Sequence, residues 1–138
     1  MIKFYFTTSS GSCRKAKAWL LKNNLPFEEI NLKTTRLTKE ELLHILSLTQ
    51  NGTHEIISKG GKAYKSLSVD LEQMTLNELF DVLNQNRLLL KRPLLVDEDR
   101  LLIGYNEDDI RKFIPRHIRR IHKAQIDQQL SQEILQYN

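Results

Sequence analysis

One sulfur atom carries most of the reactive chemistry that this sequence offers. Cys13 follows a run of small polar residues and stands where a helix is expected to begin. The partial positive charge at a helix N-terminus favours a thiolate, which could form a mixed disulfide with a small thiol or with a partner protein. Free cysteines are also among the most buried residues in proteins, so a packed and unreactive side chain is the other interpretation.

Ser10 stands three residues before Cys13 and cannot replace a thiolate as a nucleophile. A serine hydroxyl has no comparable acidity, and the sequence places no base beside it. The single cysteine also forbids an intramolecular disulfide and a zinc site made of two or more thiolates. The chain has four histidines: His44, His54, His117 and His122. They share no ligand spacing with the cysteine or with carboxylates, so we expect no metal and no cofactor.

A basic segment near the C-terminus suggests a different kind of chemistry. Between Arg111 and Lys123 the chain has six basic residues and no acidic one, which leaves 15 basic against 17 acidic residues elsewhere. Four of them share one face of an expected helix: Arg116, Arg119, Arg120 and Lys123. Such a face could contact DNA phosphates or an acidic protein, or it could simply be solvated. No motif for reading bases accompanies it, which argues against an ordinary DNA-binding protein.

The segment around Ser10 and Cys13 requires a strand before it and a helix after it. Residues 2–6 are β-branched and aromatic, which is typical of a buried strand. Apolar residues at helical spacing predict a helix from 13 to about 24, and residues 27–32 have the pattern of a second strand. A β-α-β unit of this length implies parallel strands.

Two capping boxes predict two helices in the middle of the chain. Thr38 with Glu41 opens the first, and Thr75 with Glu78 opens the second, which should continue to about residue 86. We expect Gly52 to end the first helix, because glycine takes the left-handed C-terminal position without strain.

The last third of the chain predicts a β-hairpin and a helix. Strands are expected over 92–97 and 100–104, a helix start at about Asn106, and a polar helix over about 115–137. The order of these elements indicates an α/β fold, a thioredoxin-like mixed sheet with an inserted helical segment. We expect one domain over 1–138, with its thioredoxin-like parts at about 1–33 and 88–120 and the insertion at about 34–87.

Length and composition restrict the broad class of the protein. The chain has 138 residues, of which 40% are hydrophobic and 28% are charged, so we expect a soluble globular domain. No apolar run approaches the length of a membrane span, and the N-terminus has no signal-peptide pattern. The expected location is the cytoplasm.

Several motifs together resemble one known family. They are Ser12-Cys13-Arg14-Lys15-Ala16 with Trp19-Leu20, Asn51-Gly52-Thr53, Glu55-Ile56-Ile57-Ser58, Arg92-Pro93, Val96-Asp97-Glu98, Gly104-Tyr105-Asn106-Glu107-Asp108, Ile110-Arg111, Phe113 and Pro115-Arg116. The chain is similar to the Spx family of transcriptional regulators, in the arsenate-reductase-like branch of the thioredoxin fold. The match covers about residues 2–121.

The resemblance implies a partner and a surface that binds it. Spx proteins bind the C-terminal domain of the RNA polymerase α subunit during stress responses and change promoter use, with promoter DNA contacted as part of the polymerase complex. The family's α-binding surface includes the glycine at Gly52, so the expected site is Gly52 with Ser47, Gln50 and Asn51. A bare Cα there would let the partner backbone approach closely.

The resemblance also implies a place for Arg92 and Pro93. In the family this proline is cis and the arginine lies beside the redox loop, here Ser10 to Cys13. In a reductase the arginine would hold an oxyanion through two hydrogen bonds. In this chain it is either an anion-binding residue or a structural relic.

Two departures from the family pattern affect the expected function. Spx proteins typically have Cys-x-x-Cys, but the first cysteine, which is the nucleophile position in arsenate reductases, is Ser10 here. The family implies the ClpXP protease and its adaptor as partners, yet the tail ends in Gln136, Tyr137 and Asn138 rather than small apolar residues, which weighs against that proteolysis. We therefore predict a regulator without an intramolecular disulfide switch and not an enzyme. The alternative is a thiol-dependent reductase of the arsenate reductase type.

Overall fold

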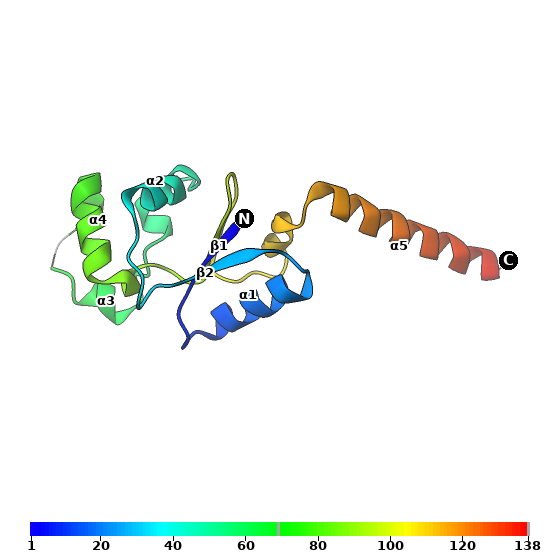
Figure 1. The fold of residues 1–138 in the computed structure, drawn as a ribbon, viewed down its shortest axis with the longest axis horizontal. Helices are drawn as coiled ribbons and strands as arrows, with labels where there is room; N and C mark the ends of the chain where they lie inside the picture. The colour runs from blue at the N-terminus through cyan, green and yellow to red at the C-terminus, as the bar shows by residue number, and fades with distance from the viewer. Residues whose placement is uncertain (69, 138) are drawn as a thin grey trace.

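A mixed four-stranded sheet forms the centre of the protein (Figure 1). In spatial order its strands are β2 (Phe27–Asn31), β1 (Ile2–Phe6), β3 (Leu94–Val96) and β4 (Leu101–Ile103). β1 and β2 are parallel, as predicted, whereas β3 runs antiparallel to both β1 and β4. This sheet and its helices confirm the predicted α/β fold class.

The computed structural model describes residues 1–68 and 70–137, with the side chains of 117–122 and 133–137 left out. Its α-helices are α1 (Gly11–Lys22), α2 (Lys39–Ser47), α3 (Lys62–Lys65), α4 (Leu76–Gln85) and α5 (Arg116–Tyr137). Short 3₁₀ helices occur at Thr53–Glu55, Leu71–Gln73, Arg87–Leu89 and Asp109–Phe113. Among the described residues, no helix is long and apolar enough to span a membrane.

The two faces of the sheet are covered by different parts of the chain. Phe4 and Leu95 point to one face and pack with apolar residues of α1. Tyr5 and Leu94 point to the other face and pack with the buried side of α2 and α4. This alternation follows from the period of two in a β-strand. The sheet therefore separates α1, with the buried Cys13, from the buried sides of α2 and α4.

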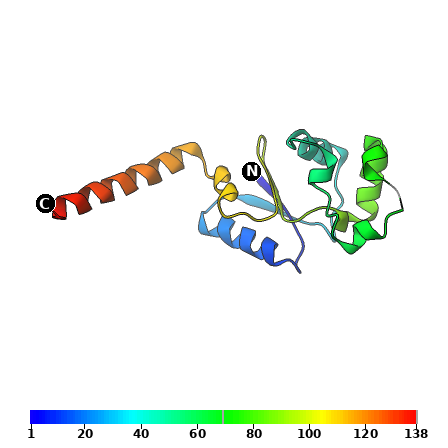
Figure 2. The ribbon, with the colours of Figure 1, turned by 180° about the vertical axis from the view of Figure 1, so that it is seen from behind.

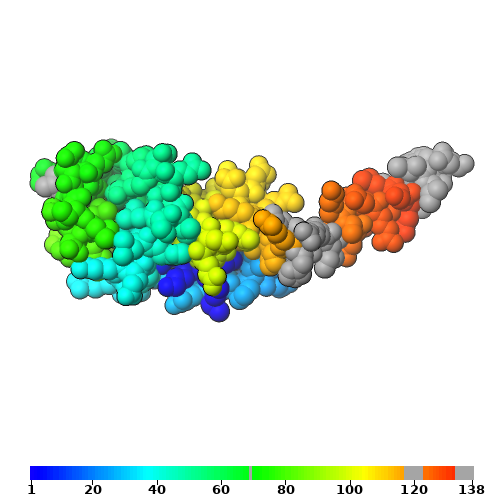
Figure 3. All heavy atoms as spheres, turned by 90° about the horizontal axis from the view of Figure 1, so that it is seen from above, coloured from blue at the N-terminus to red at the C-terminus, as the bar shows by residue number. Residues whose placement is uncertain are grey.

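The helical insertion and α5 lie at opposite ends of the molecule (Figures 1 and 2). Helices α2, α3 and α4 gather at one end, and α5 extends away from the body at the other. The space-filling view shows the same extension from above (Figure 3). The basic segment thus begins where the body of the protein ends.

The capping boxes predict the starts of α2 and α4 correctly, but the predicted end of α2 is wrong. Thr38 and Glu41 form a complete capping box at the start of α2, and Thr75 caps α4. α2 ends at Ser47, and its C-cap residue, Leu48, is right-handed, so Gly52 does not end this helix. The chain instead leaves α2 through a turn, in which the Leu48 and Thr49 amides donate to carbonyls of the last helical residues.

Two other predicted boundaries shift. α1 begins at Gly11, two residues before Cys13, because the Ser10 side chain caps the helix from further upstream. The acidic stretch after Asn106 precedes only a 3₁₀ helix at Asp109–Phe113. The Asn106 side chain accepts hydrogen bonds from the amides of Asp108 and Asp109, which forms a tight local turn there.

Candidate functional site

Ser10 is the N-cap residue of α1. Its hydroxyl oxygen accepts a hydrogen bond from the backbone N–H of Cys13 at 3.2 Å, which satisfies one of the free amides at the helix start. The Ser10 oxygen therefore has a structural role as the cap of α1.

Cys13 is packed inside the protein. Its side chain is 3% exposed and belongs to an apolar cluster that includes Phe4, Ala16 and Leu20. These neighbours offer no cation that would stabilise a thiolate. Of the two interpretations of this cysteine, the geometry favours the packed side chain.

Arg92 lies beside the loop that contains Ser10. Ser10 and Arg92 line one surface depression of about 460 Å³, together with Ser9, Ser58 and Lys91. The Arg92–Pro93 peptide bond is cis. One Arg92 guanidinium nitrogen donates to the carbonyls of Leu88 and Leu90, at 3.0 and 3.2 Å, so the arginine is partly committed to the backbone.

The predicted α-binding residues lie together on the surface. Ser47, Gln50 and Asn51 are exposed, and Gly52 is half-buried beside them. Two hydrogen bonds hold this turn: the Ser47 hydroxyl donates to the His44 carbonyl at 2.6 Å, and the Asn51 N–H donates to the Glu55 carboxylate at 3.0 Å. The turn thus presents an ordered polar surface at the end of α2.

Gly52 has a backbone conformation that only glycine adopts readily. Its φ is +95° and its ψ is −149°, and its N–H donates to the Thr49 hydroxyl at 3.2 Å. A Cβ placed on Gly52 would have no heavy atom within 4 Å. The glycine is therefore required by the turn that precedes the 3₁₀ helix Thr53–Glu55, and not by the end of α2.

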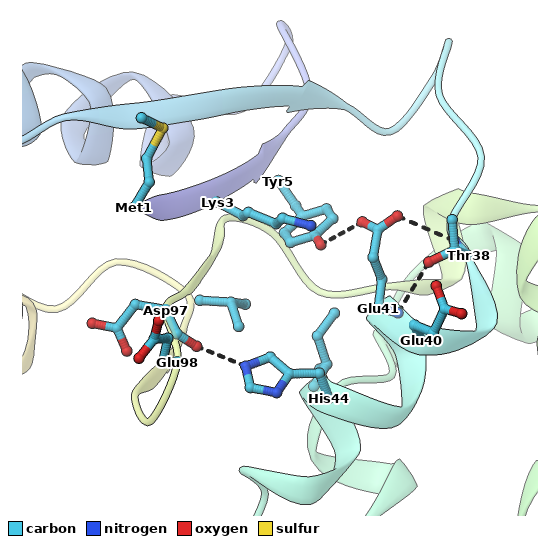
Figure 4. A pocket seen from close by; sticks show the side chains of 11 residues that line it. Met1, Lys3, Tyr5, Thr38, Glu40, Glu41, His44, Asp97 and Glu98 are labelled. Atoms are coloured by element: carbon cyan, nitrogen blue, oxygen red, sulfur yellow. Dashed lines mark hydrogen bonds between the residues drawn. The ribbon is translucent and has the colours of Figure 1, made fainter.

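A groove of about 590 Å³ lies between α2, β1 and the β3–β4 hairpin, beside the apolar contact of α2 with the sheet (Figure 4). Residues of β1, α2 and the β3–β4 hairpin line it, and two long-range hydrogen bonds cross it. The Tyr5 hydroxyl donates to the Glu41 carboxylate at 2.6 Å, and His44 Nε2 lies 2.7 Å from the Asp97 carbonyl oxygen. Burial, together with the hydrogen bond to Glu41, raises the pKa of Tyr5 above its ordinary value, so the phenol stays a donor.

The groove and its hydrogen bonds were not predicted from the sequence. Tyr5 and Glu41 are 36 positions apart, and His44 and Asp97 are 53 apart. The one available signal was a tyrosine within a buried strand, since a buried phenol usually finds a hydrogen-bond acceptor. That signal predicts a partner for Tyr5 but does not identify it.

The four basic residues predicted to contact phosphates belong to α5. Arg116 and Lys123 are exposed on this helix. The side chains of Arg119 and Arg120 lie outside the described residues. Within the part of the chain that the structure describes, no group of three His, Cys, Asp or Glu side chains could hold a metal ion.

Comparison with known proteins identifies one family. The model of the ArsC family matches residues 5–113. A protein named Global transcriptional regulator Spx, from Lactiplantibacillus plantarum, is 48% identical over 128 residues, which cover 93% of this chain and 97% of the relative. A protein of the same name from Streptococcus pneumoniae is 48% identical over 120 residues, which cover 87% of this chain and 90% of the relative.

Solved structures support the same fold. An ArsC family related protein from Bacteroides fragilis has a TM-score of 0.69 and 31% identity, over 80% of this chain and 95% of that chain. A possible arsenate reductase from Streptococcus mutans has a TM-score of 0.67 and 28% identity, over 77% of this chain and 92% of that chain. Sequence relatives named as regulators and structural relatives named as reductases thus share one architecture.

Proposed function

Since the chain belongs to the Spx branch of the ArsC family, it is a global transcriptional regulator, and we propose that it acts by binding the C-terminal domain of the RNA polymerase α subunit. Binding would change which promoters the polymerase uses. The regulator would contact promoter DNA as part of that complex and would act in the cytoplasm, where the polymerase is.

The observation that supports this proposal is the exposed turn at the end of α2. Ser47, Gln50 and Asn51 are uncharged and exposed, so their burial against a partner requires no charge to leave water. Gly52 adds a position without a side chain and with open space around it. Ser47 and Gly52 also lose little rotamer entropy on binding, because the serine side chain is short and glycine has none. This turn is therefore suited to close contact with another protein.

The proposed mechanism has no disulfide switch. Ser10 caps α1, and Cys13 is buried in the apolar cluster, so no disulfide can form between these two positions. The α-binding turn belongs to the insertion, whose core cluster is separate from the cluster that contains Cys13. Oxidants should therefore have little influence on binding.

We also propose that α5 assists the complex through phosphate contacts. Arg116 and Lys123 are exposed, and Arg119 and Arg120 complete the predicted basic face. Contacts of this kind would strengthen the assembly without selecting a sequence. Degradation by ClpXP with its adaptor stays a prediction.

The alternative function, arsenate reduction, lacks its nucleophile. The depression beside the redox loop has Arg92 for an oxyanion, but Ser10 uses its oxygen as a helix cap. We propose that the chain does not catalyse arsenate reduction with glutathione or thioredoxin as the reductant. Turnover above the uncatalysed rate that disappears in the variant Cys13→Ala would contradict this.

The proposed function is tested by titrating the full-length protein with purified α C-terminal domain in a calorimeter. The test variant is Ser47→Arg, because Arg is compatible with a helix and fills the surface expected to meet the partner. A clash within an interface can remove roughly 2 kcal/mol of binding energy, about a thirtyfold loss of affinity.

Ser131→Arg provides the matched control. Ser131 is also exposed on a helix, and its hydroxyl also donates to a backbone carbonyl one turn earlier, that of Asp127 at 3.0 Å. This variant should bind α like the wild type. If the wild type does not bind α C-terminal domain, the proposed function is wrong. If Ser47→Arg binds it with unchanged affinity, the proposed binding surface is wrong.

A further inference from the structure

α2 contacts the rest of the protein through two different sides. Leu42 and Ile45 are buried and pack in a core cluster that also contains Tyr5 and Leu94 of the sheet. Glu41 and His44 are three residues apart, so they share another side of the helix, and this side borders the groove. Apolar packing supports the first side, whereas the second faces a groove of about 590 Å³.

Tyr5 and Glu41 form the first connection across the groove. Tyr5 is 1% exposed in the central strand β1, so its hydroxyl has a fixed position. One Glu41 oxygen accepts from Tyr5 at 2.6 Å, and the other accepts from the Thr38 N–H at 3.2 Å. The same carboxylate therefore caps α2 and attaches its first turn to the sheet.

His44 and Asp97 form the second connection, one turn later. The Asp97 atom is a backbone carbonyl, which can only accept, so His44 Nε2 carries the proton and donates. The backbone carbonyl of His44 also accepts the Ser47 hydroxyl at 2.6 Å. Figure 4 shows the contact of His44 with Asp97, and the bond from Ser47 to the His44 carbonyl extends this set of contacts from the β3–β4 hairpin to the first residue of the α-binding turn.

We infer that Tyr5 and His44 are positioning residues, which hold α2 against the sheet across the groove so that Ser47 and the following turn are presented in one orientation. This inference rests on the proposed function for its effect on polymerase binding. The positioning of α2 itself can be measured in the free protein.

The expected size of the effect follows from the strength of one hydrogen bond. A single net hydrogen bond changes an equilibrium constant by a factor of roughly 2 to 12. Loss of either connection should raise the population of displaced α2 by that factor, and loss of both should raise it by about the product. A partner that binds only the attached orientation loses affinity in proportion to the remaining attached fraction, so the double variant should bind α more weakly by the same factor by which its attached fraction, measured by hydrogen exchange, falls.

The test uses Tyr5→Phe, His44→Leu and the double variant. Tyr5→Phe removes only the hydroxyl, and His44→Leu removes the donor while keeping a side chain of similar size. Hydrogen exchange of the α2 amides in the free protein measures the displaced population, and calorimetric titration with α C-terminal domain measures binding. We expect faster exchange confined to α2 and its turn, with weaker α binding in the double variant.

Two controls separate positioning from a general loss of stability. His44→Gln places an amide N–H near the position of Nε2, so it should restore both α2 protection and α affinity. Tyr105→Phe removes a hydroxyl from a half-buried tyrosine near the opposite core, and it should change neither.

The outcomes distinguish this inference from the proposed function. If the wild type does not bind α, the proposed function fails, and the exchange data alone decide whether α2 is held by these contacts. Unchanged α2 exchange in both single variants and the double variant would overturn the inference. An affinity of the double variant for α that stays unchanged although its attached fraction has fallen measurably would also overturn it, because the orientation of α2 would then be irrelevant to binding.

Discussion

Two substitutions of Gly52 should have the same effect on folding and different effects on binding. The backbone at Gly52, with φ of +95° and ψ of −149°, is unfavourable for any other residue. Such strain costs about 1–3 kcal/mol, and the cost arises from the backbone and Cβ. Because no heavy atom lies within 4 Å of a Cβ at this position, a longer side chain adds no clash in the free protein.

The folding cost should therefore be equal in Gly52→Ala and Gly52→Arg. For a chain of this size, 1 kcal/mol corresponds to a change of about 4 °C in the melting temperature, so both variants should melt roughly 4 to 12 °C lower than the wild type. A domain with an ordinary stability of about 5–15 kcal/mol stays folded after this loss.

The binding cost should separate the two variants. A methyl group at Gly52 occupies little of the space between the two proteins, whereas an arginine would hold their backbones apart. A central clash removes roughly 2 kcal/mol or more, so Gly52→Arg should bind α C-terminal domain at least about thirtyfold more weakly than the wild type, and Gly52→Ala should keep much of its affinity.

Thermal unfolding, monitored by circular dichroism, measures the folding cost. Calorimetric titration of the same preparations with α C-terminal domain measures the affinity. Equal affinity of the wild type and folded Gly52→Arg would remove Gly52 from the interface and leave it with a role in the turn only. A much lower melting temperature for Gly52→Arg than for Gly52→Ala would show that the space around this position is not open.

Four further predictions concern the loop, the groove and α5. Ser10→Ala should lower the stability of the protein by about 1 kcal/mol through loss of the helix cap, measured by urea unfolding. Diamide should leave α affinity nearly unchanged, and a gain in affinity that persists in Cys13→Ser would place a switch elsewhere. Since the pKa of Tyr5 is raised in the folded state, the unfolded chain loses this proton first, and stability should fall as the pH rises above about 10; Tyr5→Phe should flatten that decline in alkaline unfolding curves. Arg116→Glu with Lys123→Glu should weaken the polymerase–promoter complex, more at low than at high salt, while α binding in solution stays constant.

Local signals in the sequence predict the elements that carry the site. Thr38 and Glu41 mark the start of α2, since a capping box is formed by residues only three positions apart. The strand pattern at the N-terminus and the proline before the hairpin likewise depend on neighbouring residues. These signals also place Ser10 in the loop after the first strand and Cys13 within the following helix, as the structure has them.

Features that depend on distant residues were predicted less well or not at all. The sequence suggests that Gly52 ends a helix, but glycine also fits other turns with positive φ, and here the Thr49 hydroxyl and the Glu55 carboxylate form such a turn. The groove hydrogen bonds of Tyr5 and His44 join residues from different elements. Their partners depend on how the insertion packs on the sheet, which no local pattern describes.

The hydroxyl of Ser10 also determines how a cell could adjust the output of this regulator. A pair of cysteines forms a disulfide on exposure to an oxidant, and a reductant reverses this change. The Ser10 oxygen caps the first turn of α1 and cannot form a disulfide. In the proposed mechanism each molecule would therefore be in its working form as soon as it folds, and the response would scale with the number of copies present. Control would then act on synthesis, on removal, or on competition for the polymerase.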